Sequence, residues 1–169
     1  MSDQPNPAHP ILVVDDEVNA LKSFEITLRS GGFNHIIICH ESMKVLPLLE
    51  KTDIELVLLD ILMPGLTGEE ILSKVVQDFP YTPVIMVTGI NEVDTAVRCM
   101  REGAFDYITK PFDPEELVNT VRKAIKMSSQ QLENLDLRHT LTDAGVEVDV
   151  LGESEAMQAV KNLVRRIGP

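Results

Sequence analysis

The sequence LVLLDILMPG, residues 56–65, decides the fold of this chain. Four apolar residues lead directly to the carboxylate of Asp60, and Pro64 and Gly65 signal a turn soon afterwards. A continuous apolar run, without the alternation of a half-exposed strand, is typical of a parallel strand buried on both faces. The run therefore predicts a central strand whose last residue is an acid, and raises the question of why a buried strand ends on a carboxylate.

Four further apolar runs predict strands of the same kind: ILVV at 11–14, HIIIC at 35–39, PVIMVT at 83–88 and DYIT at 106–109. Amphipathic stretches between the runs predict helices over residues 17–32, 67–79, 91–103 and 113–125. Alternating strands and helices with right-handed crossovers are typical of an α/β fold. We therefore expect a five-stranded parallel sheet, doubly wound, with helices on both faces.

The expected helices carry local boundary signals. The first ends at Gly31 and Gly32, and its apolar face consists of Val18, Leu21, Phe24 and Leu28. The second begins with Thr67 and Glu70 at the spacing of a capping box. The last has Asp113 as its cap, Pro114 in its first position and Glu116 three residues after the cap.

Composition excludes several classes of function. The 169 residues are 44% hydrophobic and carry a net charge of −12, which argues against nucleic-acid binding. No apolar run is long enough to span a membrane, and residues 1–9 form a polar lead, expected to be disordered, without the features of a signal peptide. Cys39 and Cys99 lack metal or redox spacing, so we interpret them as buried thiols in a reducing cytoplasm, with a disulfide as the alternative.

Reactive side chains follow the expected strands, at the edge of the sheet where ligands bind in this fold class. They are Asp15, Asp16 and Glu17 after the first strand, Asp60 at the third, Thr88 after the fourth and Lys110 after the fifth. Three carboxylates at one edge repel one another unless a cation intervenes, and oxygen ligands suit Mg²⁺. The set therefore predicts a magnesium site.

These groups together suit phosphoryl transfer. A metal ion, a lysine ammonium and a hydroxyl stabilise the spread negative charge of a phosphoryl group. A carboxylate can itself attack phosphorus and become an acyl phosphate, which makes Asp60 the candidate nucleophile. A lone acid after a strand is more often a turn or cap residue, so the ordered set indicates the function and no single residue does.

Residues 10–127 resemble the receiver domain of two-component response regulators, the CheY-like fold. The matching segments are ILVVDDE, LVLLDILMPGLTGEE, PVIMVTG and DYITKPF. The resemblance implies that a histidine kinase phosphorylates Asp60, that Thr88 and Lys110 contact the phosphoryl oxygens, and that the bond before Pro111 is cis. The implied magnesium ligands are Asp15, Asp16, Asp60 and the backbone carbonyl of Leu62, with Asp16 favoured over Asp15 as a direct ligand.

The same resemblance implies a switch. Phosphorylation of Asp60 would draw the Thr88 hydroxyl toward the phosphoryl group and let Tyr107 rotate inward, which would reshape the face formed by residues 91–127. The alternative is that Tyr107 is an ordinary half-buried tyrosine of the sheet. Leu62 departs from the family, in which many members carry a polar residue there, and this leaves the lifetime of the phosphoryl group open.

Residues 128–150 are expected to form a helical linker, since no glycine or proline interrupts the last helix before Gly145. A 4-3 spacing typical of a short coiled coil runs through Val121, Ile125, Ser128, Leu132 and Leu135. A coiled coil would make the chain a homodimer through this helix and the 91–127 face. The alternative is a single amphipathic helix that packs on its own domain.

Residues 151–169 include GESEAM, which is similar to the entry to the AAA+ ATPase domain of NtrC-like activators. No phosphate-loop motif follows, so we interpret the segment as the start of a truncated AAA+ domain. The chain would then be the front of a sigma-54-dependent activator, whose full-length form would contact sigma-54 RNA polymerase and DNA. A stand-alone receiver or phosphorelay protein is the alternative. An aspartyl-phosphate phosphatase is disfavoured, because such enzymes usually carry a second aspartate where this chain has Leu62.

Overall fold

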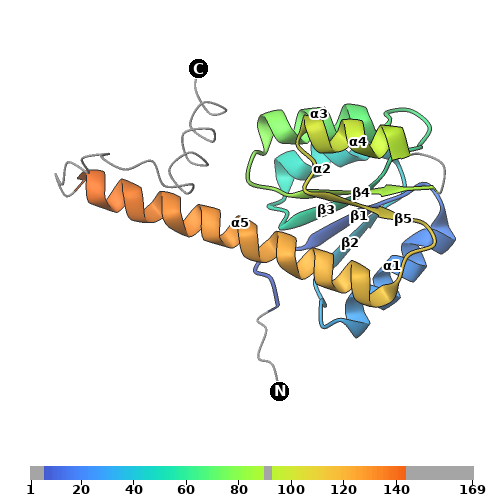
Figure 1. Ribbon diagram of the computed structural model, residues 1–169, viewed down its shortest axis with the longest axis horizontal. Helices are drawn as coiled ribbons and strands as arrows, with labels where there is room; N and C mark the ends of the chain where they lie inside the picture. The colour runs from blue at the N-terminus through green and yellow to red at the C-terminus, as the bar shows by residue number, and fades with distance from the viewer. Residues whose placement is uncertain (1–5, 90–92, 144–169) are drawn as a thin grey trace. The chain divides into compact units, whose positions relative to one another are not determined.

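The computed structural model describes residues 6–89 and 93–143 of the chain. Five parallel strands form one sheet in the order β2-β1-β3-β4-β5, as Figure 1 shows. Their bounds are β1 Ile11–Val14, β2 Ile36–Cys39, β3 Leu56–Asp60, β4 Val84–Thr88 and β5 Asp106–Thr109. The predicted five-stranded parallel sheet is confirmed, and the strand order reverses between β1 and β3.

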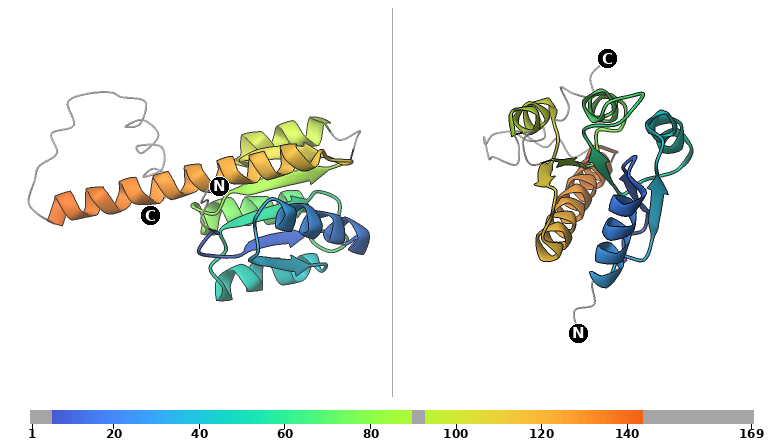
Figure 2. Two further views of the ribbon diagram at one scale, coloured as in Figure 1. Left: turned by 90° about the horizontal axis from the view of Figure 1, so that it is seen from below. Right: turned by 90° about the vertical axis from the view of Figure 1, so that its right-hand side faces the viewer.

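Helices cover both faces of the sheet (Figure 2). Helix α1 (Val18–Ser30) and the beginning of α5 (Pro114–Asp143) lie on one face. The other face carries α2 (Val45–Lys51), α3 (Gly68–Asp78) and α4 (Val93–Glu102), with a 3-10 turn, η1 (Ser42–Lys44), before α2. The fold is therefore doubly wound, as predicted.

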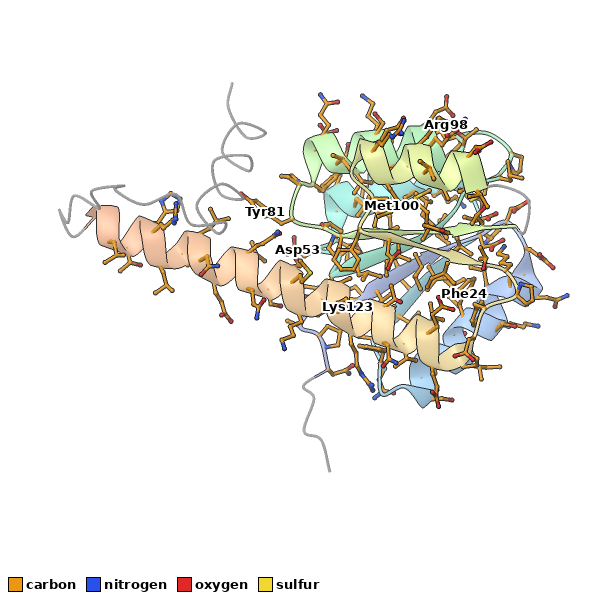
Figure 3. The ribbon with its side chains drawn as sticks, viewed as in Figure 1. Phe24, Asp53, Tyr81, Arg98, Met100 and Lys123 are labelled. Carbon is orange, nitrogen blue, oxygen red and sulfur yellow. The ribbon has the colours of Figure 1, made fainter. Side chains whose placement is uncertain are left out.

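Each face of the sheet buries its own apolar core. Strand side chains alternate between the faces, so that Leu12 and Val14 pack toward α2, α3 and α4, whereas Ile11 and Val13 pack toward α1 and α5. Phe24 of α1, labelled in Figure 3, is buried and stacks on the ring of Phe112 with ring centroids 4.6 Å apart. These cores hold the strand ends, and hence the side chains that follow them, in fixed positions.

The local boundary signals are confirmed for α3 and α5. Thr67 Oγ1 accepts a hydrogen bond from the Glu70 backbone N–H at 3.3 Å, and the Glu70 carboxylate accepts one from the Thr67 N–H at 2.8 Å, which completes a capping box. Asp113 Oδ1 accepts a hydrogen bond from the Glu116 N–H at 3.0 Å. Helix α5 begins at Pro114, as expected.

Three expectations from the sequence differ from the structure. β2 and β5 are the edge strands and are not buried on both faces, because Ile38 of β2 is 38% exposed and Thr109 of β5 is exposed. Val18, the first residue of α1, is 56% exposed and does not join the apolar face of the helix. The amphipathic pattern does not locate α2, because this helix is short and contains Pro47 in its first turn, where a helix tolerates proline.

The predicted coiled-coil seam is only partly available to a partner helix. Val121 is completely buried in the core of its own domain, Ile125 packs against that core, and Ser128 is buried. The Ser128 hydroxyl donates a hydrogen bond to the carbonyl of Tyr81 at 2.7 Å. The alternative, a helix that packs on its own domain, therefore describes α5 as far as Ser128, and Leu132 is the first seam residue that is largely exposed.

The chain divides into two units at this point, Met1–Ser128 and Ser129–Pro169. The described part of the second unit is residues 129–143, which belong to α5. The remainder of the predicted linker, the GESEAM segment and residues 1–5 of the predicted lead lie outside the described residues. Cys39 and Cys99 are buried free thiols, as interpreted, and form no disulfide.

Candidate functional site

Three acids meet at the carboxyl edge of the sheet, where the strand order reverses. Asp15 and Asp16 follow β1, and Asp60 ends the neighbouring strand β3, with Val14 paired to Leu59. Each acid offers a carboxylate oxygen within 4.8 Å of the other two. Asp15 is 1% exposed and Asp60 is 7% exposed, whereas Asp16 lies at the surface. The structure therefore brings together the three acids that the sequence predicted.

Lys110 places a cation beside two of these acids. It follows β5, and the peptide bond to Pro111 is cis, as expected. Its ammonium Nζ lies 2.5 Å from Asp15 Oδ2 and 3.6 Å from Asp60 Oδ1. Asp15 Oδ1 accepts a second hydrogen bond from the backbone N–H of Glu17 at 2.9 Å. Both oxygens of Asp15 are thus engaged, which agrees with a less direct role for Asp15 than for Asp16 in holding a metal ion.

The positive charge of Lys110 does not neutralise the negative charges of the three carboxylates. Burial, together with the negative charge of Asp15, raises the pKa of Asp60 to about 6, although the charge of Lys110 opposes this shift. Burial alone would lower the pKa of Lys110, but its hydrogen bond to Asp15 and the charge of Asp60 raise it overall. The elevated pKa of Asp60 indicates a cluster that would be stabilised by a further positive charge.

The donor set fits a hard divalent cation. The three side chains present only carboxylate oxygens, and no histidine or cysteine belongs to this cluster. Magnesium commonly binds one or two carboxylates and retains several waters, which an exposed acid such as Asp16 permits. Asp16, Asp60 and the backbone carbonyl of Leu62 are the groups that could hold it.

Thr88 and Tyr107 lie on neighbouring strands and on the same face of the sheet. Thr88 ends β4, is 1% exposed, and its hydroxyl donates a hydrogen bond to the carbonyl of Gly89 at 3.2 Å. Tyr107 of β5 is paired with Met86, two residues before Thr88, so its side chain points to the same face. Tyr107 is half-buried and packs on the core beneath α2, α3 and α4. This geometry suits a coupled movement of the two side chains, and also agrees with an ordinary sheet tyrosine.

The loop from β3 to α3 returns the chain tightly past Asp60. The Gly68 N–H donates a hydrogen bond to the carbonyl of Ile61 at 2.9 Å. A Cβ atom on Gly68 would lie 2.3 Å from the carbonyl oxygen of Asp60 and 2.7 Å from the Cα of Ile61. Only glycine allows α3 to begin so close to the backbone of the acid. Leu62, which also belongs to this loop, has a side chain that is 62% exposed.

Sequence reasoning missed one residue that touches this loop. The hydroxyl of Ser42, in η1, donates a hydrogen bond to the carbonyl of Pro64 at 2.7 Å and accepts one from the N–H of Leu66 at 3.0 Å. Ser42 is 4% exposed. No pattern in the sequence distinguishes a single serine so far from the loop, because the contact depends on the tertiary packing of η1.

Comparisons with known proteins agree on one family. The model of the response regulator receiver domain matches residues 11–122. The DNA-binding transcriptional regulator NtrC of Escherichia coli strain K12 is 34% identical over 159 residues, which are 93% of this chain and 32% of that protein. The chain therefore spans about a third of the length of this curated relative.

Solved structures give the same result. A response regulator receiver domain protein from Clostridium thermocellum has a TM-score of 0.68 at 31% identity, covering 73% of this chain and 98% of that chain. NtrX from Brucella abortus in complex with ATP has a TM-score of 0.73 at 30% identity, covering 96% of this chain and 35% of that chain. Both structures therefore share the fold described above.

Proposed function

The chain belongs to the response regulator receiver family and resembles the N-terminal part of NtrC- and NtrX-like regulators, and on this premise we propose that Asp60 accepts a phosphoryl group from a histidine kinase in the presence of Mg²⁺. The observation that supports the proposal most strongly is the position of Asp60. Its carboxylate ends a buried central strand, lies within reach of Asp15 and Asp16, and stands 3.6 Å from the ammonium of Lys110.

The transfer itself is a nucleophilic displacement. A carboxylate oxygen of Asp60 attacks the phosphorus of a phosphohistidine, the new P–O bond forms as the P–N bond breaks, and the leaving imidazole takes up a proton. Asp60 must be ionised to attack, and a pKa of about 6 leaves it largely ionised at neutral pH. The buried strand β3 holds the carboxylate in place, so little reorganisation is needed.

The other residues stabilise charge. Mg²⁺, when bound, would neutralise charge on the phosphoryl oxygens, and Asp16, Asp60 and the Leu62 carbonyl would hold it, with Asp15 as a further acid. Lys110 would move from Asp15 toward a phosphoryl oxygen, and Thr88 would turn its hydroxyl from Gly89 toward another. We infer that the chain performs only this chemistry on its own Asp60, with no other substrate.

Thr88 and Tyr107 then form the proposed switch. The buried Thr88 hydroxyl donates to the carbonyl of Gly89, a partner that a phosphoryl oxygen would replace. Tyr107 lies on the same face, only half-buried, with room to change its exposure. The rearrangement would be transmitted to the face formed by residues 91–127.

That face is the proposed dimer surface. Helix α4 exposes Val93, Val97 and Met100, which are 54%, 42% and 38% exposed, and α5 exposes Met127 at 47%. Exposed apolar side chains on these two helices are candidates for a contact with another protein. In the proposal, phosphorylation changes the dimer formed through this surface and through the exposed part of α5 that includes Leu132.

The proposed output is activation of transcription. NtrC, a relative of this chain, is named as a DNA-binding transcriptional regulator. We propose that the receiver controls an attached sigma-54-dependent AAA+ activator, that residues 151–169 begin this domain, and that the full-length protein contacts sigma-54 RNA polymerase and DNA in the cytoplasm. This chain would not itself bind nucleic acid, given its net charge of −12 over 169 residues. Among the described residues, no helix is both long and apolar enough to cross a membrane.

Intact mass spectrometry tests the proposal. The chain is incubated with acetyl phosphate, with Mg²⁺ or with a chelator, alongside the Asp60→Asn variant, and the oligomeric state is recorded on the same samples. The proposal requires a gain of one phosphoryl group in the parent chain with Mg²⁺ only. An equal gain in Asp60→Asn would contradict it.

A further inference from the structure

The loop between β3 and α3, residues 61–67, is fastened to the domain on both sides of Leu62. Resting on the function proposed above, we propose that Ser42 is a positioning residue that sets the affinity for Mg²⁺, because it fixes the loop that presents the Leu62 carbonyl. Ser42 is in η1 and touches neither the acids nor the metal position itself. Its effect would pass entirely through the backbone of the loop.

The first fastening point is next to the sheet. The N–H of Ile61 donates a hydrogen bond to the carbonyl of Val87 at 3.1 Å, and the carbonyl of Ile61 accepts one from the N–H of Gly68 at 2.9 Å. Ile61, which takes part in both bonds, directly precedes Leu62 in the chain. They are backbone to backbone, so they depend on the sheet and on the beginning of α3.

The second fastening point is Ser42. Its hydroxyl donates to the carbonyl of Pro64 and accepts from the N–H of Leu66, at 2.7 Å and 3.0 Å. A single buried hydroxyl therefore satisfies two backbone groups of the loop, on the far side of Leu62. Gly65, between those groups, has a φ of 87°, and a Cβ atom there would lie 2.8 Å from the Ser42 Oγ. The loop thus rests directly on the hydroxyl.

The side chain of Leu62 contributes little to fixing the position of this residue. Its side chain is 62% exposed, so core packing does not fix it, although its neighbour Met63 is buried. The position of its carbonyl is therefore set by its neighbours in the chain: the bonds of Ile61, the buried side chain of Met63 and the fastening point at Pro64. A metal ligand that is a backbone carbonyl can be oriented only through its neighbours in the chain, and groups that orient ligands typically change metal affinity when they are removed.

Removal of the hydroxyl should weaken metal binding without unfolding the domain. In Ser42→Ala the carbonyl of Pro64 and the N–H of Leu66 lose their common partner, and the loop that carries the Leu62 carbonyl is held less firmly. We expect the dissociation constant for Mg²⁺ to rise about tenfold. The rate of phosphorylation by acetyl phosphate should fall at low Mg²⁺ and recover at saturating Mg²⁺.

The chain offers a matched control. Ser128 is also buried, and its hydroxyl also donates to a loop carbonyl, that of Tyr81, at 2.7 Å. Ser128→Ala removes a comparable hydrogen bond at a position remote from the acids in the chain and in the sheet. A purely structural role predicts similar effects of the two substitutions on stability and none on Mg²⁺ affinity. A positioning role predicts that only Ser42→Ala changes the affinity.

The experiment is a Mg²⁺ titration by calorimetry of the full chain, with phosphorylation measured on the same preparations. Ser42→Thr, which keeps a hydroxyl, should bind as the parent does. Gly65→Ala crowds the intact Ser42 hydroxyl and strains the backbone at a φ of 87°, so it should also displace the loop and weaken binding. Faster hydrogen exchange of the Leu66 amide in Ser42→Ala would report the loss of the contact directly, even if the variant proves less stable.

Two failures can be distinguished. If the parent binds Mg²⁺ and is phosphorylated, but Ser42→Ala and Ser128→Ala share its affinity, Ser42 has only a structural role and this inference is overturned alone. If the parent neither binds Mg²⁺ nor gains a phosphoryl group, the proposed function is overturned, and this inference with it.

Discussion

Lys110 is held by Asp15 more closely than by Asp60: its ammonium lies 2.5 Å from Asp15 Oδ2 and 3.6 Å from Asp60 Oδ1. Asp15 is almost fully buried and has both oxygens engaged, so its charge is compensated within the protein. Asp60 is not compensated to the same extent, and its pKa is raised to about 6. The structure therefore holds the Asp60 carboxylate where its charged form is disfavoured, and the proposed binding of Mg²⁺ would relieve this.

Asp60→Asn should stabilise the fold at neutral pH. Burial and the charge of Asp15 raise the pKa of Asp60 from 3.8 to about 6, so the folded state holds this proton more tightly than the unfolded state does. The contribution of Asp60 to stability therefore falls as the pH rises from about 4 to about 6 and stays low above that range. We expect the variant to raise the free energy of unfolding in urea by about 1–3 kcal/mol at about pH 7.

Two controls isolate the charge of Asp60. The advantage of Asp60→Asn should disappear below about pH 4, where the carboxyl is protonated in both states. Asp53→Asn changes an exposed aspartate instead, and should alter stability by less than about 0.5 kcal/mol. A stabilisation of equal size at both pH values would contradict the electrostatic explanation.

Mg²⁺ should lower the pKa of Asp60. A divalent cation among the three acids favours the charged carboxylate, which burial and Asp15 now disfavour. Carbon-13 NMR of the Asp60 carboxyl, titrated with pH in Mg²⁺ and in KCl of the same ionic strength, measures this shift. If the two titrations coincide, the acids do not bind the ion.

Gly68→Ala should destabilise the domain and displace α3. The added methyl group would meet backbone atoms of Asp60 and Ile61 at 2.3 Å and 2.7 Å, and backbone cannot move aside as a flexible side chain can. The free energy of unfolding should fall by about 3 kcal/mol, the upper end of the usual cost of overpacking. Gly89→Ala is the matched control, because no atom of the described residues is recorded within 4 Å of a Cβ there. Equal urea midpoints for the two variants would show that this close approach does not constrain the loop.

Several features of the fold and of the acidic site can be predicted from local sequence patterns. The strand ending at Asp60 and the capping box at Thr67 depend on neighbouring residues, so the sequence alone predicts them. The three acids were predicted to converge because parallel strands carry their carboxyl ends to one edge. Val18 could not be placed correctly, since the first residue of a helix need not face the core even when its periodicity matches.

Other features depend on contacts between distant segments. The shorter distance of Lys110 to Asp15 than to Asp60 joins segments that are far apart in the sequence, and no local pattern predicts it. The contact of Ser42 with the loop requires η1 to pack under residues 64–66. In the sequence, Ser128 is a weak position of the predicted coiled-coil seam. In the structure, its hydroxyl donates a hydrogen bond to the carbonyl of Tyr81.

Tyr107→Ala should leave phosphorylation of Asp60 intact but abolish the change in oligomeric state that follows it. Tyr107 lies beside Thr88 on the sheet but belongs to neither the acids nor their cation, so Asp60 should still gain a phosphoryl group. The change in oligomeric state on phosphorylation, measured by light scattering, should be lost. The only other tyrosine, Tyr81, precedes β4 at its opposite end, and Tyr81→Ala is the control that should respond as the parent does. An unchanged response in Tyr107→Ala would assign this residue to the sheet alone.

The most direct test of the central claim is to locate the phosphoryl group on the chain. Treatment of the phosphorylated protein with borohydride reduces an aspartyl phosphate to homoserine, and peptide mass spectrometry then identifies the modified position. If Asp60 is the acceptor, homoserine should be found at position 60 alone, and only when Mg²⁺ was present during phosphorylation. Modification at Asp15 or Asp16 instead, or the same yield at Asp60 without Mg²⁺, would contradict it.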